Sequence, residues 1–298
     1  VIDGCSAQWD GEISLFAVDD GSTGLTFPSK AEIGKPKNLK QIKVLSLVCN
    51  LGHQRAIAVG LVEAFRYEEF DAVIVMDCDG EDQPEDIERL LMAFRCNPHS
   101  LIVAQRGKRS ETSTFRIAYL LYKFAFTTLT GKTIDFGNFC LIPQTLLSRM
   151  VFMPDLWNHL AATIVKSRLP ICKVKIHRGK RYAGTSKMNL VSLLIHGLSA
   201  ISVYSDVVFV RIIVMSIFLS GLTALSILVV VLLRVFTSLA IPGWASYVVG
   251  LLCVLLLQTL LFAAGATFSL LSRRSILSIV PALDAQRYVR ERITIFDF

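Results

Sequence analysis

The chain of 298 residues is apolar on average and basic, with a mean hydropathy of +0.53 and a formal net charge of +7. This length leaves room for one catalytic domain of about 200 residues and a smaller part. Apolar residues are concentrated between positions 207 and 272, which excludes a uniformly apolar fold. The seven cysteines show no Cys-x-x-Cys spacing, which favours free thiols in a reducing compartment and argues against a zinc site.

The first part of the chain alternates short apolar runs with helical patterns. Strands are predicted at Ile13–Val18, Ile42–Val48, Ala72–Met76 and Leu101–Ala104, and helices at Gln54–Phe65 and Glu85–Arg95. This order predicts an α/β fold with a mostly parallel sheet covered on both faces. Three of the strands end in polar residues, namely Asp19-Asp20, Asp77 with Asp79, and Arg106. Ligands of such sheets bind beyond the carboxyl ends of the strands, so these side chains are expected to gather at one edge.

Two segments further along the chain are candidates for amphipathic helices. Thr114–Thr130 has Arg116 and Lys123 amid aromatic residues, and residues 188–206 contain many leucines and almost no charge. The second segment predicts an interfacial helix that lies along a membrane, with an ordinary core helix as the alternative.

Two long uncharged runs follow, over 22 residues from Ile212 to Leu233 and 38 residues from Val235 to Ser272. A bilayer core of about 30 Å needs about 20 helical residues. The first run therefore predicts one membrane span, and the second, interrupted near Pro242, predicts a turn and a second span over Ser246–Leu271. A buried hairpin in a soluble core is the alternative. The predicted parts are a catalytic domain at 1–187, an interfacial helix at 188–206, two transmembrane helices at 207–272, and a C-terminal tail at 273–298.

The distribution of positive charge predicts the orientation of the spans. Arg211 precedes the first span, Arg273 and Arg274 follow the second, and the loop near Pro242 is uncharged. Positive residues mark the cytoplasmic side, so the N-terminal domain and the tail are expected to be cytosolic. A membrane surface and phosphorylated substrates also account for the net charge more simply than nucleic acid does.

Asp77-Cys78-Asp79 is the central chemical signal, because two carboxylates follow a fully apolar strand. Carboxylate oxygens bind hard divalent cations such as Mg²⁺ or Mn²⁺, and Glu81 is a possible third ligand. Such a cation stabilises the charge of a departing diphosphate. A solvated turn is the alternative. The five histidines show no metal spacing and are interpreted as structural or surface residues: His53, His99, His159, His177 and His196.

Asp19-Asp20-Gly21-Ser22-Thr23 is the second signal. Adjacent carboxylates at a strand end can accept hydrogen bonds from a base or from ribose hydroxyls, and glycine permits a sharp turn. In isolation the segment would be an ordinary turn. Together with the motif at Asp77 it indicates a nucleotide-binding site.

These motifs resemble the family 2 glycosyltransferases of the GT-A fold. The matching segments are Val18–Thr23, Asn50-Leu51-Gly52 with Ala56 and Gly60, Met76–Asp79, and Pro84-Glu85. Arg181–Lys187, followed by an interfacial helix and a hairpin of two spans, is similar to the polyprenyl-phosphate branch, which includes the dolichyl-phosphate mannose synthases and the bacterial undecaprenyl-phosphate glucosyltransferases.

The resemblance implies roles for individual residues. Asp19 and Asp20, with Gly21 and Ser22, would hold the nucleoside, while Asp77 and Asp79 would serve the metal and the diphosphate. Arg106, Arg181, Ser186 and Lys187 would hold phosphates of the donor and the lipid acceptor, for which basic side chains are suited. Charge at the membrane surface is the alternative for Arg181 and Lys187. Gly137-Asn138-Phe139 stands where the family often has Gly-Asp-Phe, so Asp135 is considered as a substitute base.

Two departures from the family affect the expectations. The family begins with a strand that carries Pro-x-Tyr-Asn, and this chain starts after the place where that strand should lie. Either the sequence is truncated or the strand is absent, and in the second case a central strand is lost. Glu81 replaces the usual glutamine and adds a negative charge.

The resemblance predicts transfer of a hexose from a nucleotide-diphosphate sugar, UDP-glucose-like by preference, to undecaprenyl phosphate. The enzyme is expected to be an inverting, metal-dependent, multi-pass protein of a bacterial inner membrane, with a possible homo-oligomer formed through its hairpin. A non-catalytic membrane scaffold on the same fold is one alternative. A processive polysaccharide synthase is another, but its Gln-x-x-Arg-Trp motif is absent from the chain.

Overall fold

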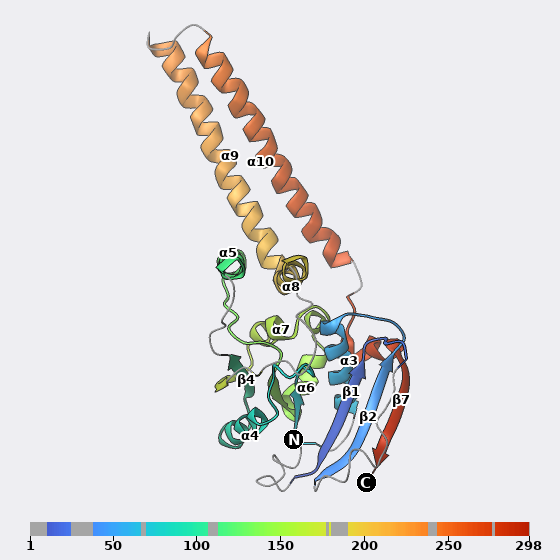
Figure 1. The fold of residues 1–298 in the computed structure, drawn as a ribbon. Coiled ribbons are helices and arrows are strands. Elements are labelled where there is room, and N and C mark those ends of the chain that lie inside the picture. The colour runs from blue at the N-terminus through green and yellow to red at the C-terminus, as the bar shows by residue number, and fades with distance from the viewer. Residues whose placement is uncertain are drawn as a thin grey trace. The chain divides into compact units, whose positions relative to one another are not determined.

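A computed structural model describes residues 11–24, 38–66, 70–106, 113–176, 179, 190–237, 243–275 and 278–297 (Figure 1). The chain forms two compact units. The hairpin unit contains Ala125–Gly131 and Tyr204–Leu277, and the larger unit contains the rest.

The larger unit contains two sheets. The first has the order β1-β2-β7, with β1 (Ile13–Asp19) parallel to β2 (Leu39–Leu47) and β2 antiparallel to β7 (Val289–Asp297). The second has the order β3-β5-β4-β6, formed by β3 (Ala72–Val75), β5 (Cys140–Pro143), β4 (Leu101–Arg106) and β6 (Ile171–Ile176). In it β4 and β6 are parallel, whereas β5 is antiparallel to both of its neighbours.

The α/β fold is confirmed, and all four predicted strands are present within a few residues of their expected ends. The sheets are mixed rather than mostly parallel. The difference comes from β5 and β7, which the sequence pattern did not predict and which each run antiparallel to their neighbours. The strands β1 and β3 are outer strands of separate sheets.

Helix α3 (His53–Arg66) contacts both sheets, through β1 and β3. Alternate residues of a strand point to opposite faces, which explains how β4 serves two cores. Val103 packs in the core that contains α3, whereas Ile102 packs with Leu90 of α4 (Asp86–Cys96) in the core on the other face. The carboxyl ends of β3 and β4 therefore lie at the edge of a sheet that is covered on both faces.

The remaining elements of the larger unit are α6 (Gln144–Val151), η1 (Pro154–Trp157), α7 (Leu160–Ser167), α8 (Leu190–Ser202), α11 (Pro281–Asp284) and η2 (Ala285–Tyr288). Helix α5 (Ser113–Thr130) begins in the larger unit and ends in the hairpin unit. The Tyr122 ring of α5 lies against Gly197 of α8. A Cβ added at Gly197 would come within 2.7 Å of that ring.

The C-terminal segment returns to the larger unit after the hairpin. Strand β7 pairs with β2, and Arg292 on β7 donates to Glu63 of α3 through Nε at 2.6 Å and Nη2 at 3.1 Å. The Glu63 side chain is only 6% exposed, and Gln286 also donates to it. Burial alone would raise the pKa of Glu63, but the hydrogen bonds from Arg292 and Gln286 and the nearby positive charges hold that pKa below its ordinary value. This segment is therefore a folded part of the larger unit.

The hairpin unit is formed by α9 (Ser205–Phe236) and α10 (Trp244–Ser275), both long and apolar enough to cross a membrane. Only 17% and 6% of their most apolar windows are buried, so they do not resemble core helices of a soluble protein. A buried hydrogen bond of 2.7 Å joins Ser220 to Thr259 between the two helices. Near the start of α9 the Arg211 guanidinium donates to the carbonyl of Thr128 in the last turn of α5, where positive charge is favourable.

Candidate active site

The turn after β3 carries the predicted carboxylates. The Asp77 backbone N–H donates to the carboxylate of Asp82 at 3.1 Å, and the Glu81 backbone N–H donates to Asp79 Oδ1 at 3.0 Å. Asp82 is 1% exposed, so its carboxylate holds the turn from the interior of the protein. Gly80 has a φ of +85°, a conformation that glycine adopts without strain. The turn is thus built by its own acidic side chains, and Asp77 remains one quarter exposed.

The second predicted motif ends β1 and contacts the start of α3. Asp20 accepts two backbone hydrogen bonds, from Leu51 at 2.7 Å and from Gly52 at 2.9 Å. Asp19 accepts from the backbone of Ser22 at 3.1 Å and from the Ser46 hydroxyl at 3.4 Å. Asp20 therefore fixes the loop that leads into α3.

Gly21 lies where the motif turns, with a φ of +75°, and an added Cβ would come within 2.7 Å of the Asn50 backbone nitrogen. Only glycine is compatible with this close approach.

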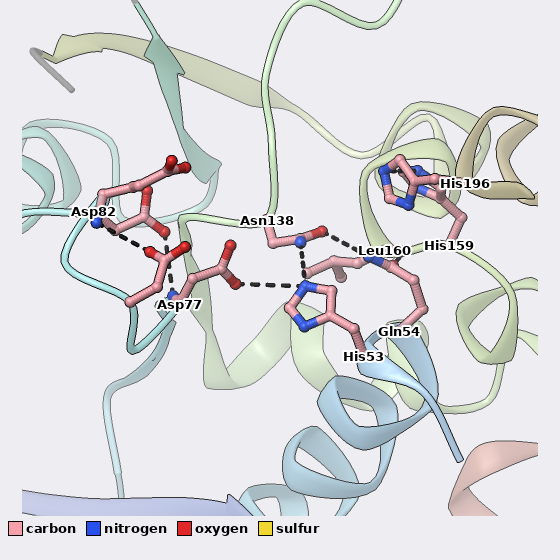
Figure 2. Close-up of polar contacts among 10 residues, drawn as sticks. His53, Gln54, Asp77, Asp82, Asn138, His159, Leu160 and His196 are labelled. Carbon is pink, nitrogen blue, oxygen red and sulfur yellow. Dashed lines mark hydrogen bonds and ion pairs between the residues drawn. The ribbon is translucent and has the colours of Figure 1, made fainter. Parts of the chain in front are cut away.

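The first residue of α3 connects the two motifs. His53 Nε2 lies 3.4 Å from Asp77 Oδ1 and 2.8 Å from Asn138 Nδ2 (Figure 2). Gln54 Nε2 donates to Asn138 Oδ1 at 3.1 Å, and Gln54 Oε1 accepts from the backbone N–H of Leu160 at 2.7 Å. This polar chain runs from the first residue of α7 to the Asp77 carboxylate. We call it the His53 relay.

Two histidines, the buried His159 and the half-buried His196, lie close to the far end of the relay. His159 caps α7 by accepting from the Ala162 N–H through Nδ1, and its Nε2 lies 3.2 Å from Nε2 of His196 on α8 (Figure 2). Burial, together with the smaller effects of the neighbouring His196 and His53, lowers the pKa of His159 to about 3. Burial also lowers the pKa of His196, with a smaller effect from His53. Both rings are therefore neutral at physiological pH and serve as packing between α7 and α8.

Asp135, the substitute base expected from the sequence, pairs elsewhere. Its Oδ2 accepts from Lys173 Nζ on β6 at 2.8 Å and from Gln105 Nε2 on β4 at 2.7 Å. The structure therefore uses this carboxylate to tie the loop before β5 to β4 and β6. Arg106 ends β4 and is aligned with Ile176 of β6.

Gly179 brings the segment after β6 to the acidic turn. Its N–H donates to the carbonyl of Glu81 at 2.9 Å, and an added Cβ would lie 2.4 Å from the carbonyl oxygen of Gly80. The predicted phosphate-binding residues Arg181, Ser186 and Lys187 lie outside the described residues.

Among the described residues, no group of three or more histidine, cysteine, aspartate or glutamate side chains is placed to hold a metal ion. The donor set near Asp77 still suits a divalent cation that takes its other ligands from a diphosphate and water, as Mg²⁺ does in many phosphate sites. Asp77 and Asp79 are the carboxylates that would supply oxygens to it. The buried Cys140 thiol nearby is inert, because burial and the charges of Asp82 and Asp77 raise its pKa to about 12.

Known proteins identify the family of this chain. Residues 1–154 match the family described as Glycosyl transferase family 2. The chain belongs to this family. It is a glycosyltransferase, and Asp77 and Asp79 lie within the matched residues.

Curated relatives of this glycosyltransferase include proteins with and without a stated substrate. It is 26% identical over 244 residues to the uncharacterized glycosyltransferase YkcC of Bacillus subtilis, covering 79% of this chain and 72% of YkcC. It is 24% identical over 200 residues to the undecaprenyl-phosphate 4-deoxy-4-formamido-L-arabinose transferase of Proteus mirabilis, covering 63% of this chain and 56% of that protein. The matched part thus spans little more than half of the second relative.

The carboxylates were predictable from the sequence, but the His53 relay was not. His53 was interpreted as structural or surface, whereas its ring lies beside Asp77. The signal that was available is local, because His53 directly follows Gly52 at the start of a predicted helix and thus lies beside the Asp20 motif. Its partner Asn138 is 85 positions away, so no short pattern joins them.

Proposed function

We propose that this glycosyltransferase transfers a hexose from a nucleotide-diphosphate sugar to a polyprenyl phosphate at the cytosolic face of a bacterial inner membrane. A UDP-sugar is the preferred donor and undecaprenyl phosphate the preferred acceptor. Relatives named for transfer to undecaprenyl phosphate support the choice of acceptor.

The observation that carries the proposal is the presence in one chain of the Asp77/Asp79 turn and of two exposed apolar helices, α9 and α10. The turn supports the chemistry for a diphosphate donor, and the helices support residence in a membrane, where a lipid acceptor lies. Charged residues near the helix ends support a cytosolic location of the larger unit, since Arg273 follows the second apolar run.

Asp77 and Asp79 would hold the divalent cation. When bound, such a cation neutralises the diphosphate and stabilises its charge as it departs. The protein itself positions these oxygens, because Asp82 holds the backbone of Asp77 and Asp79 accepts from the backbone of Glu81. A carboxylate held in place costs little reorganisation when the donor binds.

Asp19 and Asp20 would lie beside the nucleoside. Asp20 fixes the loop at Leu51 and Gly52. We assign direct contact with ribose or base to Asp19 and to the turn at Gly21. Arg181, Ser186 and Lys187 would hold phosphates. The backbone hydrogen bond from Gly179 to Glu81 supports this role for Arg181. It holds the chain beside the acidic turn at position 179, two residues before Arg181.

The acceptor is already an anion, so the reaction needs little help from a base. An oxygen of the lipid phosphate attacks the anomeric carbon and forms the new C–O bond. The bond from that carbon to the diphosphate oxygen breaks, and the nucleoside diphosphate leaves with the electron pair. Positioning for in-line attack is the main contribution of the protein. This single displacement inverts the anomeric centre, and a product of retained configuration would refute it.

Helix α8 supports a membrane-surface location of the site. Three of its apolar side chains, Leu194, Ile195 and Leu198, are 60–63% exposed. The helix ends at Ser202, and α9 begins at Ser205, so α8 directly precedes the first long apolar helix in the sequence. An exposed apolar helix face next to a span is typical of an interfacial helix.

The test is sugar transfer in membranes from cells that express the full-length protein. Radiolabelled UDP- and GDP-sugars are supplied with undecaprenyl phosphate, and Asp79→Ala and a chelator serve as controls. Label in the lipid phase that disappears in both controls is the expected result. Folded protein that transfers no sugar from any donor would contradict the proposal.

One observation favours a second candidate, a non-catalytic membrane scaffold. The strands β1 and β3 border separate sheets, although both contact α3. A divided sheet would hold the nucleotide motif and the acidic turn less rigidly than one continuous sheet. Nucleotide binding without turnover by the full-length protein is the result that would favour the scaffold.

A further inference from the structure

The inference concerns the His53 ring, which faces the Asp77 carboxylate at a distance of 3.4 Å between Nε2 and Oδ1 (Figure 2). About half of the His53 side chain is exposed, at 53%, so a ligand can reach it. It is the first residue of α3, directly after the loop that Asp20 holds at Gly52.

The hydrogen bonds of the relay have one consistent direction, fixed by a backbone group. The Leu160 N–H can only donate, so the Gln54 atom that it contacts must be the amide oxygen. Gln54 then presents its NH₂ group to Asn138 Oδ1. Asn138 consequently presents its own NH₂ group to His53 Nε2, which must accept. The relay thus selects the tautomer of His53 in which Nε2 carries a lone pair.

A lone pair on Nε2 means that the contact with Asp77 is not a hydrogen bond. A neutral ring that accepts at Nε2 has no hydrogen to donate to the carboxylate, so two electron-rich atoms face each other. Two such atoms at short distance are favourable when they share a cation. Two adjacent ligands of an octahedral cation, with bonds of about 2.1 Å at about 90°, lie about 3.0 Å apart. The observed separation of 3.4 Å lies within about 0.4 Å of this value, so a small side-chain movement brings both atoms onto one cation.

We propose that His53 is a metal ligand of this glycosyltransferase and binds the divalent cation through Nε2 together with Asp77. This inference rests on the proposed function, which requires the cation at the acidic turn. The cation replaces the Asn138 N–H as partner of the Nε2 lone pair, and the amide turns aside. Imidazole nitrogen binds first-row transition metals better than Mg²⁺, so the site is expected to bind Mn²⁺ more tightly than Mg²⁺.

Coordination by His53 explains why an amide at position 138 is favourable. A carboxylate at position 138 would accept from the ring and keep a proton on Nε2, which would block coordination. An amide donates to Nε2 and leaves it without a proton. Asn138 is 9% exposed and, with Gln54, acts on the cation only through His53, so both are positioning residues.

The experiment is pulsed electron paramagnetic resonance of Mn²⁺ bound to the full-length protein in detergent, with UDP or GDP present. Coordination by imidazole gives a ¹⁴N coupling in the Mn²⁺ spectrum, which oxygen ligands do not give. We expect this coupling in the wild type and its loss in His53→Gln, with Mn²⁺ bound about tenfold more weakly. Asn138→Asp is expected to lose the coupling as well. His99→Ala, which removes an exposed histidine before β4, is the matched control and keeps it.

The outcomes separate this inference from the proposed function. Bound Mn²⁺ without ¹⁴N coupling in the wild type refutes His53 as a ligand and leaves the metal-dependent transferase standing. Coupling that persists in His53→Gln assigns the nitrogen to another residue and also refutes the inference. No binding of Mn²⁺ with either nucleotide refutes both. If His53→Gln fails to fold, Asn138→Asp takes its place, and a wild-type spectrum without coupling still refutes the inference.

Discussion

The buried histidine at the start of α7 predicts that the larger unit loses stability in mild acid. The folded state holds the pKa of His159 at about 3, because the ring is buried beside His196. An unfolded histidine has a pKa of about 6.5. Between these values the unfolded chain binds a proton that the folded chain excludes. The free energy of unfolding therefore falls with decreasing pH by about 1.4 kcal/mol per pH unit below about pH 6.5, or about 2 kcal/mol at pH 5. The lowered pKa of His196 acts in the same direction.

The assay is urea denaturation in mild detergent, followed by the fluorescence of Trp157. This tryptophan is 5% exposed, and its ring packs against Tyr288 in the larger unit. Trp9 and Trp244 are replaced by phenylalanine to remove their signals. The matched variant is His159→Asn, which keeps an acceptor for the Ala162 N–H at the helix cap. It is expected to reduce the slope by about 1.4 kcal/mol per pH unit. Equal losses between pH 7 and pH 5 in both proteins would refute the reasoning.

Three further predictions concern the acidic turn, the C-terminal strand and the hairpin. Asp79→Ala is expected to lower kcat/KM for sugar transfer by about 10²–10³ without lowering Tm, and a smaller effect would show that this carboxylate does not serve the transition state. Arg292→Met leaves the Glu63 carboxylate buried without its guanidinium partner. The free energy of unfolding is expected to fall by about 2 kcal/mol. This is less than the ~3–5 kcal/mol lost on breaking a fully buried pair, because Arg292 is 45% exposed. Faster hydrogen exchange along β7 checks it, and unchanged exchange contradicts it. Ser220→Ala removes the hydrogen bond to Thr259 and should weaken the hairpin by about 0.6 kcal/mol, measured by unfolding in sodium dodecyl sulfate; no change beyond error counts against the contact.

The sequence predicted those elements whose signal is local. Strand β3 and the carboxylates after it could be predicted because Ala72–Met76 is wholly apolar and ends directly in Asp77. Strand β5 was missed because it has only four residues and depends on pairing with β3 and β4 on either side. Strand β7 was assigned to a tail because it follows the apolar runs, although its pairing with β2 places it in a sheet.

The site was predicted only in part, for the same reason. Asp77 and Asp79 share one motif, whereas the partners of His53 come from distant parts of the chain. Asn138 and Leu160 reach the ring and Gln54 only after the loop before β5 and the start of α7 have packed against α3. Asp135 shows the converse, because a carboxylate that looked available in the sequence pairs with Lys173 in the fold.

The most direct test of the proposed transfer is the formation of a lipid-linked sugar by the purified full-length protein in nanodiscs that contain undecaprenyl phosphate, with Mn²⁺ and a labelled nucleotide sugar. Asp79→Asn, which preserves the size of the side chain, is the matched control. We expect the wild type to place label in the lipid fraction and the variant to place almost none. Label that stays in the nucleotide sugar, or that appears only as free sugar for every donor supplied, would contradict the account.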